Sequence, residues 1–183
     1  MVHGGPVWPT VLAVPVIAIH NEDWGFETNC FVCEPKNEHG LRIPFFHDTE
    51  AGCVFAEFDL SMSFSGAPAF VHGGVTLAIL DEAMAWACIA VAHRWAVTVE
   101  TTTRFLGAVY VDKPDRVEAR VGEVTPEQMR VEAHVIDAKG RVRAEANAVF
   151  AVLGEAQAAR AIGIDITGPA GSGSAGYTKP GPA

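Results

Sequence analysis

Residues 71–92 read VHGGVTLAILDEAMAWACIAVA. After the Gly73-Gly74 pair, this run predicts a helix of about eighteen residues from Val75 to Ala92, apolar on almost every side. A helix that is apolar all round is either a membrane span or the buried centre of a domain. This one is marginally short for a span and carries adjacent carboxylates, Asp81 and Glu82, near its middle. We therefore expect it to be buried in protein, not in lipid.

The remainder of the core is predicted to be β structure. Apolar and polar residues alternate on both sides of a turn at residues 137–140, which is the period-two pattern of half-buried strands. The predicted strands are Cys53–Leu60 before the helix, and Val97–Leu106, Arg116–Val124, Met129–Val135 and Val142–Phe150 after it. Consecutive strands with short turns imply an antiparallel sheet. A single long helix must then cover one face of that sheet, which gives an α+β domain.

Composition restricts the possible partners and the compartment. The chain has 183 residues, 49% of them apolar, so it is long enough for one domain with a sizeable core. A formal charge of −9 argues against a nucleic-acid partner, because phosphate binding needs a basic surface, although a few local basic residues suffice for a smaller anion. The four cysteines are few and predict free thiols in a reducing compartment, hence a cytoplasmic protein.

The domain is predicted to occupy residues 30–153. Residues 1–29 are expected to form an arm that packs on the domain or on a partner chain. Their apolar stretch, residues 7–17, resembles an export signal, but no Lys or Arg precedes it and two prolines interrupt it. Residues 154–183 are expected to form a short Ala-rich helix over Glu155–Ile162 and, from Gly168, a loose tail rich in Gly, Pro and Ser.

The two acids of the helix and the glycines before it are the candidate functional groups. Burying an unpaired carboxylate costs several kcal/mol. Asp81 in such a setting suits a general base or a nucleophile. The alternative is that one acid points to solvent while the other pairs with an arginine, and for Glu82 both interpretations stay open. Gly73 and Gly74 leave backbone N–H groups free at the helix start, where a developing oxyanion can bind. Otherwise the pair is only a tight turn.

Spacing along the helix predicts how these groups work together. Gly73 and Asp81 are eight positions apart, about 12 Å along a helix axis. One helix cannot easily direct both groups at a single carbonyl carbon, whereas two antiparallel copies can. If both groups serve one reaction, a twofold dimer is the economical solution.

The run from Val71 to Met84 resembles the hotdog thioesterases of the phenylacetate-pathway and THEM type. The resemblance extends from about Cys30 to Leu153, and its core is His-Gly-Gly followed by an acid seven residues after the second glycine. It implies a hotdog fold, in which an antiparallel sheet wraps a long central helix and dimers join their sheets edge to edge. Such dimers sometimes pair into tetramers.

The resemblance also implies the chemistry. Its substrates are acyl-CoA thioesters, hydrolysed without a metal or other cofactor. The residues that match are Gly73 as the oxyanion-hole amide, Asp81 as the catalytic carboxylate, His72 and Gly74 beside the thioester, and Thr98 as a hydroxyl that positions water. Several relatives have an asparagine six residues before the histidine, where this chain has Gly66. The pocket must therefore hold its water or acyl group differently.

Cys30-x-x-Cys33 raises the question of a metal or redox site. A structural zinc ion needs four ligands, and the other two cysteines are distant single residues. By residue type alone, His39 and His47 could supply the remaining ligands. We nevertheless expect a core or loop motif and no metal. Arg104, Lys113 and Arg116 are candidates for contact with CoA phosphates, although bases at strand ends are usually just solvated.

Two other functions are compatible with the same fold. One is a non-catalytic protein that binds acyl-CoA without releasing the thiol. The other is a dehydratase or hydratase acting on acyl thioesters. Dehydratases of this fold begin their helix loop with His-Phe-Pro-Gly-x-Pro, and the comparable stretch here is Ser63–Pro68. Ser63 stands where their catalytic histidine would be, so the group that shuttles the proton is missing.

Overall fold

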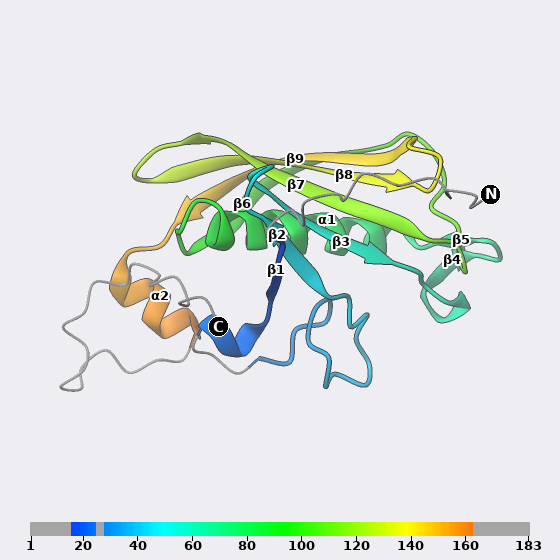
Figure 1. The fold of residues 1–183 in the computed structure, drawn as a ribbon, viewed down its shortest axis with the longest axis horizontal. Helices are drawn as coiled ribbons and strands as arrows, with labels where there is room; N and C mark the ends of the chain where they lie inside the picture. The colour runs from blue at the N-terminus through cyan, green and yellow to red at the C-terminus, as the bar shows by residue number, and fades with distance from the viewer. Residues whose placement is uncertain (1–15, 25–27, 163–183) are drawn as a thin grey trace, which may run out of the picture.

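The computed structural model describes residues 16–24 and 28–162. Its centre is helix α1, Gly73–Ala90, which lies against one face of a seven-stranded sheet (Figure 1). The sheet packs on one side of the helix and the preceding loops on another, so apolar residues are needed on more than one side of it. Its length and mean hydropathy of 1.4 would suit a membrane span, yet 50% of it is buried inside the protein. The long central helix predicted from the sequence is confirmed.

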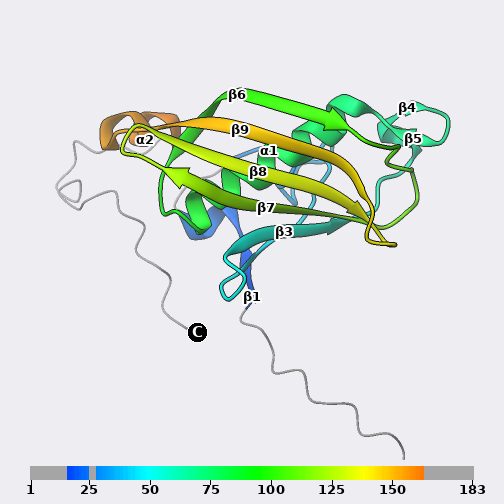
Figure 2. The same cartoon turned by 90° about the horizontal axis from the view of Figure 1, so that it is seen from above.

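Every pairing in the main sheet is antiparallel, and the strand order is β1-β2-β3-β7-β8-β9-β6. Seen from above in Figure 2, the long strands run side by side across α1. The strands are β1 Val16–Ile19, β2 Phe45–Asp48, β3 Cys53–Phe58, β6 Ala96–Phe105, β7 Asp115–Val124, β8 Gln128–Asp137 and β9 Val142–Val152. The smaller elements are β4 Ser65–Ala67, β5 Phe70–Val71, the 3-10 helices η1 Asn21–Trp24 and η2 Met62–Phe64, and helix α2 Glu155–Ile162.

The five predicted strands and the α+β class are confirmed, and every strand end lies within two residues of the predicted one. β1, β2 and the β4–β5 pair were not predicted. β1 falls within the expected arm, where it pairs with β2 and extends the sheet. Helix α2 forms where the short Ala-rich helix was predicted. Residues 1–15, 25–27 and 163–183 lie outside the described residues, so the domain boundaries stay predictions.

The core lies between α1 and the inner face of the sheet. Met84, Trp86 and Cys88 of α1 are buried in it, so these three side chains belong to the core of the subunit. From the sheet, alternate residues of β7, β8 and β9 point inward, and Val117, Val135 and Phe150 have no exposed surface. The alternation read from the sequence therefore marks the inner face correctly.

The sheet ends on one side at β6, and this edge is apolar and open. Four large hydrophobic side chains along or just after β6 are 45 to 58% exposed: Val97, Val99, Phe105 and Leu106. An unpaired strand edge offers a row of backbone donors and acceptors to another strand. A subunit with this edge in water has both the geometry and the apolar surface for pairing with a second copy.

Candidate active site

The N-terminus of α1 forms one part of the candidate site. His72 caps the helix: its ring Nδ1 accepts a hydrogen bond from the Gly74 N–H at 2.9 Å. Its carbonyl oxygen accepts from the Val75 and Thr76 N–H groups at 2.9 and 3.0 Å. The N–H of Gly73 takes no part in these capping bonds, and His72, Gly73 and Gly74 are exposed. A free amide at the positive end of a helix dipole is suited to bind an anionic oxygen.

Asp81 and Thr98 form the second part. The Thr98 hydroxyl on β6 donates to Asp81 Oδ1 at 2.7 Å. Asp81 is half-buried and Thr98 is exposed. The Asp81 carboxylate therefore lies near the surface of the subunit, on a helix that is otherwise mostly apolar. The hydrogen bond holds one carboxylate oxygen and thereby fixes the orientation of the side chain. The distance is the usual one for a hydrogen bond donated by a hydroxyl group.

Both parts lie along the open β6 edge. Asp81 is held at the start of the strand through Thr98. At the other end, a Cβ atom built on Gly73 would be 3.6 Å from Cζ of Phe105. Within one subunit the two parts are separated by eight residues of the same helix, or about 12 Å. The structure thus brings His72 together with Gly74, and Asp81 together with Thr98, but not one pair with the other. The chemical roles of these residues stay predictions.

Gly66 lies directly against the helix cap. A Cβ atom at this position would be 3.0 Å from both Cα and Cδ2 of His72, closer than side chains normally pack. The asparagine that several relatives have here would therefore fit only if His72 moved. His72 fills the space that a longer side chain at position 66 would need, which gives a physical reason for this departure from the relatives' pattern.

The simpler interpretation expects Glu82 to point to solvent or to pair with an arginine. In the structure it does neither. Its Oε1 lies 3.3 Å from the Cys30 sulfur, and the carboxyl is mostly buried. Burial raises the pKa of Glu82 to about 8, and the charge of the Cys30 thiolate adds to the shift. Sequence reasoning missed this contact. The only signal was the Cys30-x-x-Cys33 spacing, which does not indicate where its partner lies.

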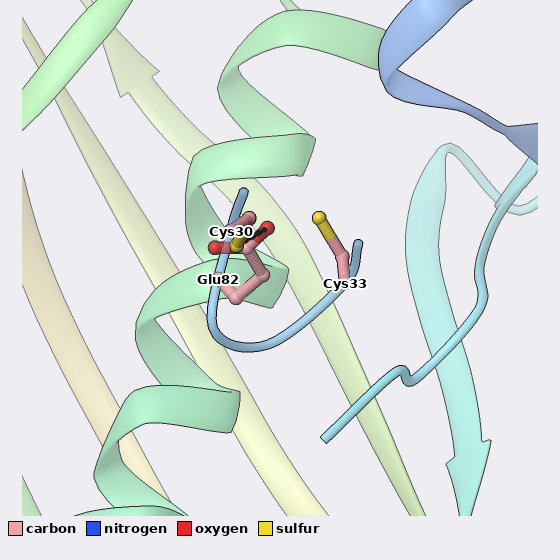
Figure 3. Close-up of side chains that lie close together, drawn as sticks. All are labelled: Cys30, Cys33 and Glu82. Atoms are coloured by element: carbon pink, nitrogen blue, oxygen red, sulfur yellow. Dashed lines mark hydrogen bonds between the residues drawn. The ribbon is translucent and has the colours of Figure 1, made fainter. Parts of the chain in front are cut away.

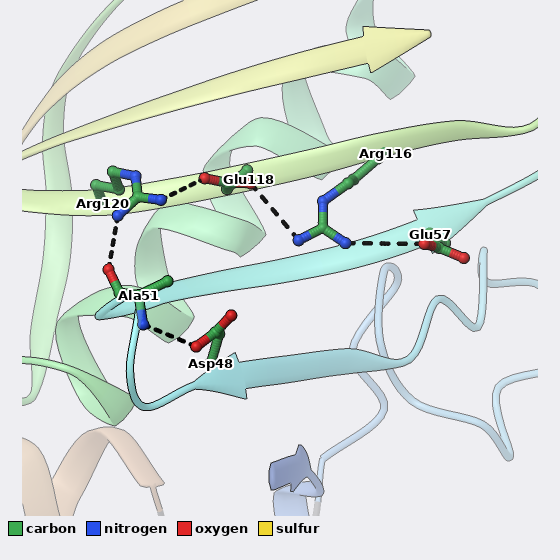
Figure 4. Close-up of polar contacts among 6 residues, drawn as sticks. All are labelled: Asp48, Ala51, Glu57, Arg116, Glu118 and Arg120. Carbon is green, nitrogen blue, oxygen red and sulfur yellow. Dashed lines mark hydrogen bonds and ion pairs between the residues drawn. The ribbon is translucent and has the colours of Figure 1, made fainter. Parts of the chain in front are cut away.

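The bases considered for CoA phosphates differ in their surroundings. Arg104 forms an ion pair with Glu145 at 2.7 Å. Arg116 lies between Glu57 and Glu118, at 3.7 and 3.5 Å, in the network drawn in Figure 4. The same network joins Arg120 to Glu118 and to the Ala51 carbonyl, and Asp48 to the Ala51 N–H. The charges of Arg104 and Arg116 are thus matched within the chain.

Lys113 has a different setting. It lines a hollow of about 350 Å³ at one end of the sheet, with Tyr110, Arg141 and Arg143 among the other lining residues. Arg141 and Arg143 both contact Asp137 at 2.7 Å, and these bonds hold the pKa of that carboxyl well below its usual range. Of the three candidates, only Lys113 forms no ion pair with another residue in the described part of the chain.

Comparison with known proteins agrees with this fold. Residues 69–144, from the loop before α1 into β9, match the family model of the thioesterase superfamily. Comparison with curated proteins gives no match. A solved thioesterase superfamily protein is similar with 21% identity and a TM-score of 0.60, over 64% of this chain and 57% of that one. This chain therefore spans little more than half the length of that protein.

Two further structures cover 56% of this chain. One is a Streptococcus mutans protein bound to acetyl-CoA, with 18% identity over 82% of its chain and a TM-score of 0.54. The other is the Escherichia coli PaaI protein from the phenylacetic acid degradation operon, with 17% identity over 74% of its chain and a TM-score of 0.53. At such low identity these likenesses establish the fold.

The helix wrapped by an antiparallel sheet is the hotdog fold. Residues 69–144 match the thioesterase superfamily model, and the hotdog fold expected from the sequence is confirmed.

Proposed function

We propose that this protein hydrolyses acyl-CoA thioesters to a free acid and CoA, at a site formed between two copies of the chain. The observation that carries the proposal is the position of Asp81, held by Thr98 on the same open edge where the Gly73 amide is exposed. Two copies that pair antiparallel through β6 would bring the Asp81 of one subunit toward the Gly73 of the other. The site is then complete only in the dimer.

The proposed reaction uses these two groups in different ways. The thioester carbonyl oxygen accepts a hydrogen bond from the Gly73 N–H, which stabilises the negative charge that develops on it. Asp81 takes a proton from water, and the water oxygen attacks the carbonyl carbon. The carbon–sulfur bond then breaks, the acid is formed, and CoA leaves as its thiol after taking up a proton. Alternatively, the Asp81 carboxylate attacks the carbonyl carbon directly, the carbon–sulfur bond breaks, and CoA leaves as a thiolate that takes up a proton; water then hydrolyses the resulting anhydride to the free acid and the Asp81 carboxylate.

Similar proteins support acyl-CoA as the substrate class. The Streptococcus mutans structure is bound to acetyl-CoA, and the family model describes thioesterases. The exposed apolar side chains of β6 offer surface for an acyl group. Single-turnover hydrolysis in ¹⁸O-labelled water tests the anhydride route. Label in the Asp81 carboxylate shows that an anhydride formed and that water attacked its Asp81 carbonyl, because direct attack of water on the thioester labels only the free acid.

The Asp81→Asn variant tests the proposal. It keeps the size of the side chain and its bond with Thr98, but removes the base, so kcat should fall by about a thousandfold with an unchanged fold. Asp59→Asn, at an exposed acid outside the site, is the matched control. Retention of most thiol release by Asp81→Asn would refute the assignment. Calorimetric binding of acyl-CoA without thiol release by the native protein would favour the non-catalytic binding protein.

Gly73→Pro tests the oxyanion donor without disturbing the helix. Gly73 is the first helical residue, a position where proline is well tolerated, and His72 before it is already extended. The substitution removes the N–H, so kcat should fall by about a hundredfold.

Mixing the two variants tests the shared site. In a dimer of one Asp81→Asn and one Gly73→Pro chain, one of the two shared sites keeps both intact groups. An exchanged mixture of two nearly inactive proteins should therefore regain about a quarter of native activity. If both groups came from one chain, every site in the mixture would lack one of them. No gain of activity after exchange, verified by mass spectrometry of the mixed dimers, would contradict a site across the interface.

A further inference from the structure

Two thiols and a carboxylate gather on the side of α1 that carries Glu82. The ligand atoms of Cys30, Cys33 and Glu82 all lie within 4.8 Å of one another. Figure 3 shows the two cysteines on one tight loop, with Cys30 hydrogen-bonded to the Glu82 carboxyl that projects from the helix. All three side chains are half-buried. The cluster does not include His39 or His47, the two histidines considered as possible ligands from the sequence.

The loop holds the Cys30 sulfur as a ready acceptor. The backbone N–H of Val32 points at it from 3.3 Å, and the N–H of Cys33 also bonds to it. Such bonds stabilise a thiolate, which is the form of cysteine that binds metals. The loop itself is fixed: the Asn37 amide bonds to the carbonyls of Asn29 and Cys30, at 3.1 and 3.3 Å. The thiols are therefore presented to Glu82 by a defined backbone.

The cluster places a carboxyl group and two thiols together without a matching basic side chain among the described residues. Among the described residues, no lysine, arginine or histidine forms an ion pair with Glu82, and Asp81 is its neighbour in sequence. A buried carboxylate needs a charge partner or a proton. A divalent cation would satisfy the carboxylate and both thiols at once.

We propose that Cys30, Cys33 and Glu82 form a binding site for a zinc-class divalent metal ion. Two cysteine sulfurs select zinc and similar borderline or soft metals over magnesium and calcium, which prefer oxygen ligands. Ligand atoms around a tetrahedral zinc ion are about 3.5 to 3.8 Å apart. The 3.3 Å between Cys30 Sγ and Glu82 Oε1, and the 4.8 Å limit for the whole cluster, need only small adjustments to reach these values.

Three protein ligands leave a fourth position, for water or for a neighbouring side chain. The Asn21 Oδ1 atom lies 3.8 Å from the Cys33 sulfur, and Asn21 is buried and bonded to Glu34. The ion would join the cysteine loop and the segment before it to α1, at the residue beside Asp81. The ion would thereby brace the helix turn that presents Asp81, and this role rests on the proposed function, in which Asp81 is the catalytic carboxylate.

Metal content and spectroscopy of the full chain test this proposal. The protein is purified under reducing conditions, stripped with a chelator and titrated with Zn²⁺, with bound metal counted by mass spectrometry. We expect about one zinc ion per chain, and at least tenfold weaker binding in Cys30→Ser, Cys33→Ser and Glu82→Gln. Cys53→Ala, at a buried cysteine on β3 outside the cluster, is the matched control and should bind zinc like the native chain.

Three results would overturn the site. They are no stoichiometric zinc on the reduced native protein, native zinc affinity in the Cys30→Ser/Cys33→Ser double variant, or a Cys30–Cys33 disulfide that persists in the reduced protein, detected as a mass two hydrogens lower. If the cysteine variants do not fold, cobalt substitution of the native chain decides. Thiolate-to-cobalt charge-transfer bands with intense tetrahedral d–d absorption support the site, and their absence rejects it.

Discussion

Replacing Thr98 by valine removes the hydroxyl that donates to Asp81 and leaves the side chain almost unchanged in shape. Both residues are β-branched and suit a strand, so β6 should keep its conformation. The lost bond is 2.7 Å long and reaches a carboxylate. Hydrogen bonds to charged groups contribute about 1.5 to 3 kcal/mol when buried, and because Thr98 is exposed we take the lower end. If the bond orients Asp81 for catalysis, about 1.4 kcal/mol corresponds to a tenfold lower kcat.

The assay is steady-state thiol release from an acyl-CoA that the native protein hydrolyses, with kcat and KM measured separately. Thr98→Ser restores a hydroxyl at this position and should recover most of the lost kcat. Thr102→Val makes the same chemical change on the outward side of β6, away from Asp81, and should leave kcat unchanged. Native kcat in Thr98→Val, or an equal loss in Thr98→Ser, would show that this hydrogen bond does not position the carboxylate.

Three further substitutions test other parts of the structure. Val99→Lys places a charge on the apolar β6 edge and should convert dimers to monomers in light scattering, with loss of activity; an unchanged mass would exclude this edge as the interface. Gly66→Asn should displace His72 from its cap and lower the free energy of unfolding by about 1 to 2 kcal/mol in chemical denaturation, whereas a native midpoint would mean that His72 moves freely. Burial, and then the charge of Asp137, raise the pKa of Asp115 to about 6. The ionised form of Asp115 therefore destabilises the folded state above that pH, and this destabilisation disappears as the pH falls toward 4. Asp115→Asn should therefore raise the free energy of unfolding by about 1 kcal/mol at pH 8, after allowance for solvent screening, and leave it unchanged near pH 4; an equal effect at both pH values would contradict this.

The sequence predicts the elements whose patterns are long and local. α1 is an eighteen-residue apolar run, and β8 and β9 alternate over ten or eleven residues around a turn that contains Gly140, at φ 76°. β1 and β2 have four residues each, and β5 has two. Segments so short carry too little periodicity to be recognised, and pairing with a distant strand is what makes them β structure.

In the candidate site too, sequence patterns predict the groups that lie close together in the chain and miss the contacts between distant residues. The helix start and Asp81 are visible because their spacing lies within one helix. Thr98 is 17 positions from Asp81 and was selected by resemblance to a family, not by a pattern in the chain. The contact between Cys30 and Glu82 joins positions 52 residues apart. No local rule predicts which acid a distant Cys-x-x-Cys loop will meet, because that depends on how the loop crosses the finished fold.

Adjacent acids in an apolar helix have a physical explanation in the direction each one takes. Successive helical residues project about 100° apart, so Asp81 faces Thr98 on β6 while Glu82 faces the Cys30 loop. Each carboxylate has its own partner, yet the negative charge of Asp81 still acts on Glu82 and raises its pKa. A proton or a metal ion on Glu82 removes that repulsion. Asp81 then remains the single negative charge at this helix turn, on the side where the substrate is proposed to bind.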